Sequence, residues 1–103
     1  QLRRAAISVP SNIAEGSGRN HSKDSIPFFF IARGSLYEIE TQLIISFDLE
    51  YISDSHLKEV LEQVTRCKKL INGFINYFQK QTTNQQPTTI NEILQAYGNN
   101  DSN

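Results

Sequence analysis

The sequence is poor in residues that would build a cross-linked or membrane-spanning protein. Its single cysteine, Cys67, excludes an internal disulfide, which fits a reducing cytosol. No apolar run approaches the roughly 20 residues that a helix needs to cross a bilayer, and no signal peptide opens the chain. We therefore expect a cytoplasmic protein with no membrane partner.

Patterns for catalysis and metal binding are also missing. His21 and His56 have no His, Cys or carboxylate at metal-ligand spacing, and no Glu-x-x-His motif of the di-iron bundles is present. Cys67 lies on an apolar stripe, which predicts a buried side chain rather than a nucleophile. Glu38 and Glu40 are two residues apart and would point to different sides of a helix. The sequence thus predicts no enzyme, no metal and no cofactor.

The net charge of the chain is small, but its charged residues are unevenly distributed. The 103 residues, with a net charge of −1, predict one small domain with a modest core. Residues 1–34 carry five Lys or Arg against two acids, whereas residues 35–63 carry seven acids against one Lys. The basic end and the acidic middle could face different partners, or each other in an oligomer.

Helical periodicity begins at the first residues, where apolar side chains recur at helical spacing over 2–15. Pro10 would remove one backbone hydrogen bond, to the carbonyl of Ala6, and either kink this helix or restart it. Gly16 and Gly18 should end it, since glycine tolerates the left-handed conformation of a C-cap. Because the chain opens at Gln1 inside this helix, we expect that sequence to its N-terminal side has been lost or left out.

A second helix is predicted from about 24 to 51. With Asp24 as N-cap, and Ser22 as the alternative cap, Pro27 falls in the first turn, where its missing N–H is harmless. Its apolar residues form two stripes, and two stripes predict burial on two sides. The first stripe is Ile26, Phe29, Phe30, Leu36, Leu43, Ile44 and Phe47, and the second is Phe28, Ala32, Ile39, Ile45, Leu49 and Ile52.

A third helix is predicted from about 55 to 80, capped by Ser53 or Asp54. Its similar length and the short connection before it favour an antiparallel hairpin. We therefore predict an all-α, antiparallel up-down helix bundle over residues 1–80. Residues 81–103 are expected to form a polar linker, a short helix at 90–97 after a capping-box pattern, and a mobile tail.

The basic residues of the first third are the candidate site. Arg3, Arg4, Arg19 and Lys23 could form a phosphate-binding patch for nucleic acid, or they could pair with acids within or between subunits. The stretch 16–19, Gly-Ser-Gly-Arg, could cradle a phosphate, although a plain turn between helices is the simpler interpretation.

Arg33 calls for a separate explanation, because it lies between apolar residues of the second helix. A partly buried guanidinium needs a partner. We predict a structural ion pair between Arg33 and Glu15, Glu38 or Glu40.

Three stretches carry a resemblance to a known family. They are residues 1–16 (QLRRAAISVPSNIAEG), 31–36 (IARGSL) and 38–43 (EIETQL). They resemble the four-helix-bundle family of proteins encoded in intervening sequences of bacterial 23S ribosomal RNA genes, to which the accessory variability proteins of diversity-generating retroelements are related. The resemblance covers about residues 1–80.

The resemblance implies an up-down four-helix bundle, a ring-shaped homopentamer and no enzymatic activity. In the family a first helix precedes the QLRR motif, so this chain would supply three helices of four. Pro27 departs from the family pattern.

We expect an oligomer that binds RNA or a nucleic-acid-handling protein through its basic segment. The rivals are a pure assembly module and a helical ribonuclease, for which Arg19 and His21 are too closely spaced.

Overall fold

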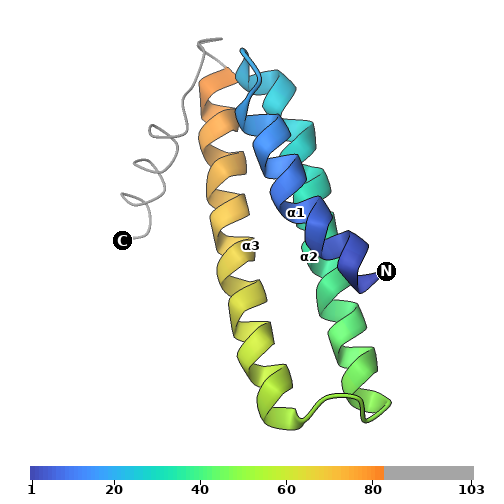
Figure 1. Cartoon of the computed structure of the whole chain (residues 1–103). Coiled ribbons are helices and arrows are strands. Elements are labelled where there is room, and N and C mark those ends of the chain that lie inside the picture. The colour runs from blue at the N-terminus through green and yellow to red at the C-terminus, as the bar shows by residue number, and fades with distance from the viewer. Residues whose placement is uncertain (83–103) are drawn as a thin grey trace, which may run out of the picture.

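A computed structural model describes residues 1–82 of the chain, which form three consecutive α-helices: α1 (Leu2–Ser17), α2 (Ser22–Asp48) and α3 (Asp54–Thr82). Each helix runs antiparallel to the one before it, and α2 packs against both α1 and α3 (Figure 1). The all-α prediction is confirmed. The described part contains three helices, so a four-helix bundle is not confirmed. Residues 81 and 82 of the predicted linker belong to α3, and the rest of that linker, the predicted helix at 90–97 and the predicted tail lie outside the described residues.

The ends of the helices follow local chemistry only in part. Ser53 caps α3 as predicted, since its Oγ accepts a hydrogen bond from the His56 N–H at 3.2 Å. By contrast, α2 begins at Ser22 with His21 as N-cap and no side-chain cap, so the prediction of an Asp24 cap is wrong. As a result Pro27 lies in the second turn, where its ring removes a hydrogen bond to the carbonyl of Lys23.

Helix α1 is continuous through Pro10, so the predicted alternative of a restarted helix is wrong. Its C-cap, Gly18, has φ −86° rather than a left-handed conformation. Gly16 is buried for a different reason: a Cβ at this position would lie 2.8 Å from Phe29 Cε1 and 3.0 Å from the Ser25 carbonyl oxygen. Gly16 therefore permits the close approach of α1 to α2.

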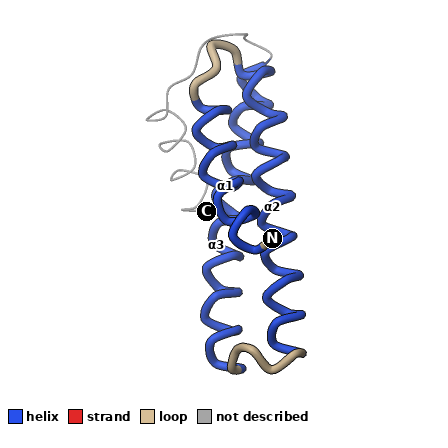
Figure 2. Tube along the Cα trace, turned by 45° about the vertical axis from the view of Figure 1, so that its right-hand side comes forward, coloured by secondary structure: helices blue, strands red, loops and turns tan. Residues whose placement is uncertain are grey.

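The core is aromatic where all three helices meet. Phe29 of α2 and Phe78 of α3 are fully buried, with ring centroids 4.7 Å apart in an edge-to-face arrangement, and Phe74 packs on Phe29 at 5.6 Å. In this half of the molecule α1 lies across α2 (Figure 2). Ser8 and Ser35 add a hydrogen bond of 2.7 Å between α1 and α2.

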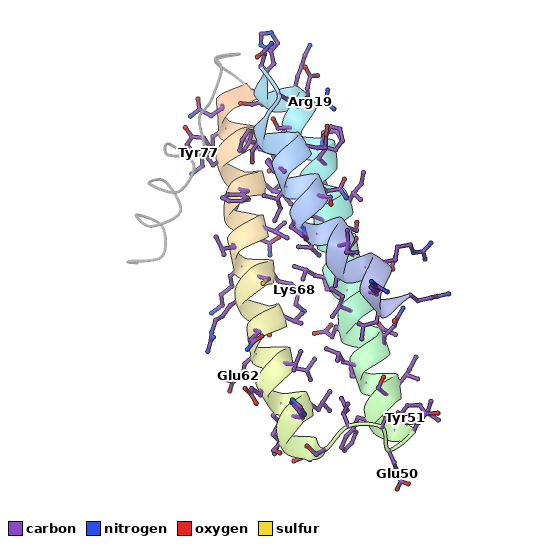
Figure 3. All side chains as sticks on the ribbon, viewed as in Figure 1. Arg19, Glu50, Tyr51, Glu62, Lys68 and Tyr77 are labelled. Carbon is purple, nitrogen blue, oxygen red and sulfur yellow. The ribbon has the colours of Figure 1, made fainter. Side chains whose placement is uncertain are left out.

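Among residues 1–82, the other half consists of α2 and α3 alone, because α1 begins beside a part of α2 past the middle of that helix (Figure 1). Its start is marked by the Gln42 amide, which donates to Gln1 Oε1 at 3.5 Å. Towards the α2–α3 turn several large apolar side chains are exposed: Ile44 (44%), Ile45 (50%), Leu49 (59%) and Tyr51 (78%). Tyr51 lies in the turn itself (Figure 3).

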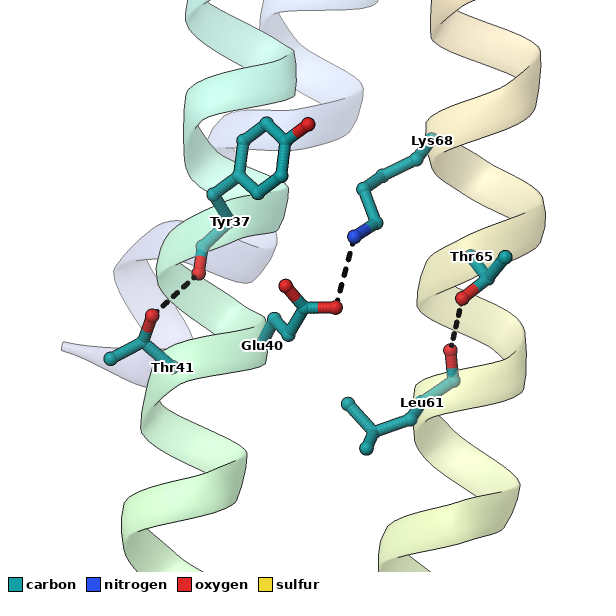
Figure 4. A network of polar contacts seen from close by, with 6 residues as sticks. All are labelled: Tyr37, Glu40, Thr41, Leu61, Thr65 and Lys68. Carbon is teal, nitrogen blue, oxygen red and sulfur yellow. Dashed lines mark hydrogen bonds and ion pairs between the residues drawn. The ribbon is translucent and has the colours of Figure 1, made fainter.

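One partly buried ion pair joins α2 and α3 near the middle of their length. Lys68 Nζ lies 2.9 Å from Glu40 Oε2 and 4.8 Å from the centroid of the Tyr37 ring (Figure 4). Lys68 therefore neutralises one acid of the acidic middle segment within the chain.

Among residues 1–82 there is no helix long and apolar enough to cross a membrane.

Candidate nucleic-acid interface

Arg3 and Arg4 lie in the first turn of α1, and both side chains are exposed. Successive residues of a helix point about 100° apart, so the two guanidinium groups leave the helix in different directions. Arg4 lines a shallow depression with Glu38 of α2, yet neither arginine forms an ion pair within residues 1–82. Both charges are available to a ligand.

Arg19 lies at the opposite end of α1, in the loop before α2 (Figure 3). Its guanidinium is 2.9 Å from Glu15 Oε2 and stacks over the Phe28 ring at 4.6 Å from the centroid. The ion pair is largely exposed, with 44% and 62% of the two side chains accessible, and such pairs contribute little stability. Arg19 is thus held in place but still faces solvent.

Lys23 is exposed in the first turn of α2 and has no ion-pair partner within the described part of the chain. It lies close to Arg19 in sequence, across the short loop. Arg4 and Arg19 are 15 residues apart, which is about 22 Å along a helix. The four candidate residues therefore form two groups, one at each end of α1, rather than one patch within a single chain.

The predicted ion pair of Arg33 is wrong for this chain. Arg33 is partly buried, as expected, but its Nη1 donates to Asn72 Oδ1 on α3 at 3.0 Å, and its guanidinium lies 4.6 Å from the centroid of the Phe30 ring. A neutral amide and an aromatic face satisfy the cation in place of a carboxylate. The side chain bridges α2 and α3.

The three acids predicted to serve Arg33 have other surroundings. Glu15 pairs with Arg19, and Glu40 pairs with Lys68. Glu38 is exposed and has no ion-pair partner among residues 1–82. Sequence reasoning assigned these acids to Arg33 and missed Lys68, whose place on the α2-facing side of α3 depends on how the two helices align.

The loop between α1 and α2 does not cradle an anion with the amides first considered. The Gly18 N–H donates to the Ala14 carbonyl at 3.1 Å, and the Arg19 N–H donates to the Gly16 carbonyl at 3.3 Å. These donors are used by the end of α1. The free amides lie a few residues later, at the start of α2.

A groove of about 220 Å³ opens between α1 and α3, with α2 as its floor. Cys67 lies on it and is exposed, so the prediction of a buried thiol is wrong. The apolar stripe of α3 is wider than α1 and α2 together can cover. The lining residues are Ala6, Val9, Pro10, Leu36, Ile39, Val60, Gln63, Val64 and Cys67.

Neither histidine takes part in a cluster of candidate metal ligands. Within residues 1–82 no group of three or more His, Cys, Asp or Glu side chains is close enough to hold an ion. His21 is the exposed N-cap of α2, and His56 is exposed in the first turn of α3. Neither histidine therefore belongs to a metal-ligand cluster formed within residues 1–82.

Sequence reasoning missed one group of cations. Lys58, Arg66 and Lys69 line an open depression on α3, in which Lys58 pairs with Asp54 and Arg66 lies 3.9 Å from Glu62. Lys69 has no ion-pair partner among residues 1–82. The signal was present as an i, i+8, i+11 spacing of basic residues, but interleaved acids obscured it.

Comparison with known proteins adds the family. The profile described as "23S rRNA-intervening sequence protein" matches residues 1–73, which covers most of the chain and all of α1 and α2. No curated protein and no solved structure gives a significant match. The matched region contains the three motifs and the basic residues discussed above. The chain therefore belongs to the family of 23S rRNA-intervening sequence proteins.

Proposed function

We propose that the chain is a non-enzymatic, cytoplasmic subunit that assembles into a homo-oligomer and binds RNA through Arg3, Arg4, Arg19 and Lys23. The observation that carries the proposal is the combination, on one small chain, of exposed basic side chains with uncovered apolar surface. Soluble proteins rarely leave large apolar patches open. Assembly would cover the apolar surface and repeat the basic groups.

The groove between α1 and α3 supports a fourth helix in the assembled bundle. In an up-down four-helix bundle, the helix before α1 would contact both α1 and α3, which are the two helices that flank this groove. The proposal rests on the family resemblance for the existence of that helix. It explains why Cys67, Pro10 and Ala6 are exposed here although they lie on an apolar face.

A thiol measurement tests this proposal. If a helix covers the groove, Cys67 in the native assembled protein should react with a thiol reagent much more slowly than a free thiol. It should reach the rate of a free thiol only after unfolding. Cys67 is the only cysteine, so the readout needs no further substitution. Immediate reaction of native, oligomeric protein would overturn the proposal of a covered groove.

The exposed side chains of α2 support a ring, with a pentamer proposed from the resemblance. Phe30, Tyr37 and Ile44 recur every seven residues and are 40%, 51% and 44% exposed. Ile31 and Ile45, also about half exposed, lie on another side of the helix. A ring needs two different contact surfaces on each subunit, and α2 offers two. The proposed relation to retroelement accessory variability proteins points to the same assembly.

RNA binding would then depend on the repetition of these basic groups around the ring. One chain presents two small basic groups at opposite ends of α1, but a ring would present each group once per subunit. Multivalent contacts of this kind can raise affinity by about 10²–10⁴-fold. Phosphate contacts of this type tolerate any sequence and weaken steeply with salt.

The test is a salt titration of RNA binding. Arg3→Gln with Arg4→Gln should lower the affinity and reduce the slope of log K against log salt by about 1.4, as for two lost single-strand phosphate contacts. Lys58→Gln with Arg66→Gln is the matched control, because it also removes two exposed cations but leaves the N-terminal segment intact. The oligomeric state of each variant is measured by light scattering.

The rival function is an assembly module that binds no nucleic acid. The Arg19–Glu15 pair favours it, because this arginine is already engaged within the chain. If the Arg3 and Arg4 substitutions loosen the oligomer, or if the unmodified protein binds no RNA at low salt, the assembly module replaces our proposal. A stable monomer at micromolar concentration would contradict both.

A further inference from the structure

A small cavity of about 80 Å³ lies at the N-terminal end of α2, where this helix meets the end of α3. Of the residues that the structure describes, His21, Ser22, Lys23 and Thr82 line it. One water molecule takes about 30 Å³ in the liquid, so the cavity has room for a group of a few heavy atoms. These four side chains are of polar types, whereas the groove between α1 and α3 is lined mostly by apolar residues.

Ser22 contributes an unexplained polar atom to this cavity. The residue is 1% exposed, and its Oγ has no hydrogen-bond partner among the described residues. A buried hydroxyl without a partner is costly, and native proteins rarely leave one without an occupant nearby. Thr82 does not serve as the partner, because no hydrogen bond joins the two hydroxyls; the Thr82 hydroxyl donates to the Gln79 carbonyl at 2.6 Å.

The backbone around Ser22 is also rich in free donors. The first N–H groups of a helix have no acceptor within the helix, and among residues 1–82 no side chain caps α2. The Asp24 N–H is used by the His21 carbonyl at 3.0 Å, whereas the Ser22 and Lys23 amides have no backbone acceptor in the described part. The positive end of the 27-residue helix α2 therefore borders the cavity, which Ser22 and Lys23 of its first turn help to line.

We propose that this cavity binds one phosphate group, through the Ser22 hydroxyl, the Ser22 and Lys23 amides and the Lys23 ammonium group. The oxygens of a phosphate accept all of these donors, and a helix N-terminus favours their charge. The adjacent carboxylate of Asp24 does not line the cavity, since residues two apart point to different sides of a helix. Assigning the phosphate to RNA rests on the proposed function, whereas the anion site itself does not.

The direct test follows the amide resonances of ¹⁵N-labelled protein during titration with inorganic phosphate. We expect saturable shifts at Ser22 and Lys23. Ser22→Ala should weaken phosphate binding by about tenfold, as expected for a lost hydrogen bond to a charged group. Lys23→Gln should weaken it as well, so the proposal does not depend on one variant.

Ser17→Ala is the matched control. The Ser17 Oγ is also buried and without a partner among residues 1–82, but Ser17 does not line the cavity. It should leave phosphate binding unchanged. Equal phosphate affinity of the Ser22→Ala and Ser17→Ala variants, or no shift at the Ser22 and Lys23 amides in the unmodified protein, would overturn the site.

Two RNA ligands then identify the source of the phosphate. If a 5′-phosphorylated oligoribonucleotide binds more tightly than its 5′-hydroxyl counterpart and Ser22→Ala removes the difference, the site takes a terminal phosphate. If both RNAs weaken equally in Ser22→Ala, it takes a phosphodiester. If inorganic phosphate binds but neither RNA depends on Ser22, the assignment to RNA is overturned. Phosphate binding by a protein that binds no RNA would leave the site standing without the proposed function.

Discussion

The two halves of the molecule are built from the same pair of long helices but differ in what covers them. In the half that contains the loop between α1 and α2, three helices enclose Phe29 and Phe78, which are fully buried. In the half that contains the α2–α3 turn, no third helix is present among the described residues, and Ile45 and Leu49 are at least half exposed. The two halves therefore differ in how far the described helices cover their apolar side chains.

Because of this difference, we expect the three-helix half to supply most of the stability of the chain and the two-helix half to mediate its assembly. Burial of large apolar side chains contributes about 25 cal/mol per Å² of area removed from water, and within one chain only the three-helix half gains it fully. The two-helix half keeps its apolar side chains available to a partner. We therefore expect substitutions in the first half to unfold the chain and those in the second to alter its association.

The largest expected effect is that of Phe29→Ala. Removal of a fully buried aromatic ring should lower the free energy of unfolding by about 3–5 kcal/mol, since the ring packs on both Phe74 and Phe78. Leu49→Ala in the other half should change it by less than about 0.5 kcal/mol in the absence of a partner. Urea unfolding at a fixed protomer concentration measures both. Equal losses would mean that both halves are buried alike in solution.

A smaller effect is expected from two glycine substitutions that differ only in their surroundings. Gly16→Ala places a Cβ 2.8 Å from Phe29 Cε1 and should cost about 1–3 kcal/mol as α1 is pushed from α2. Gly34→Ala meets nothing within 4 Å and should stabilise α2 by up to about 1 kcal/mol, because alanine favours helix. Thermal melts of the two variants should move in opposite directions. A Gly16→Ala protein as stable as the parent would show that α1 does not approach α2 so closely.

The smallest effect concerns the ion pair at the boundary between the halves. A double-mutant cycle with Glu40→Gln and Lys68→Gln should give a coupling of about 0.5–1 kcal/mol, because the side chains are only 32% and 20% exposed. The same cycle on Asp54 and Lys58, 63% and 74% exposed, should give a coupling close to zero. Both couplings come from denaturant unfolding. A larger value at Asp54 and Lys58 would mean that burial does not govern these pairs.

Local reasoning succeeded where the cause of a feature is itself local. Ser53 caps α3 because its side chain reaches the N–H of His56 three residues later, and this spacing is visible in the sequence. Reasoning from one helix at a time failed for Gly16, Arg33 and Cys67. The environment of each is set by another helix: Phe29 packs against Gly16, Asn72 accepts from Arg33, and α1 leaves the groove beside Cys67 open.

The sequence by itself determined that this protein is helical and where its helices lie, because apolar periodicity and breaker residues act over a few residues. It also determined the family, through motifs in the first 73 residues. Only the tertiary structure decided which cations are unpaired and which apolar residues are covered within residues 1–82, and that the buried Ser22 hydroxyl has no partner there. Those properties depend on the alignment of side chains from helices far apart in sequence, which no local pattern encodes.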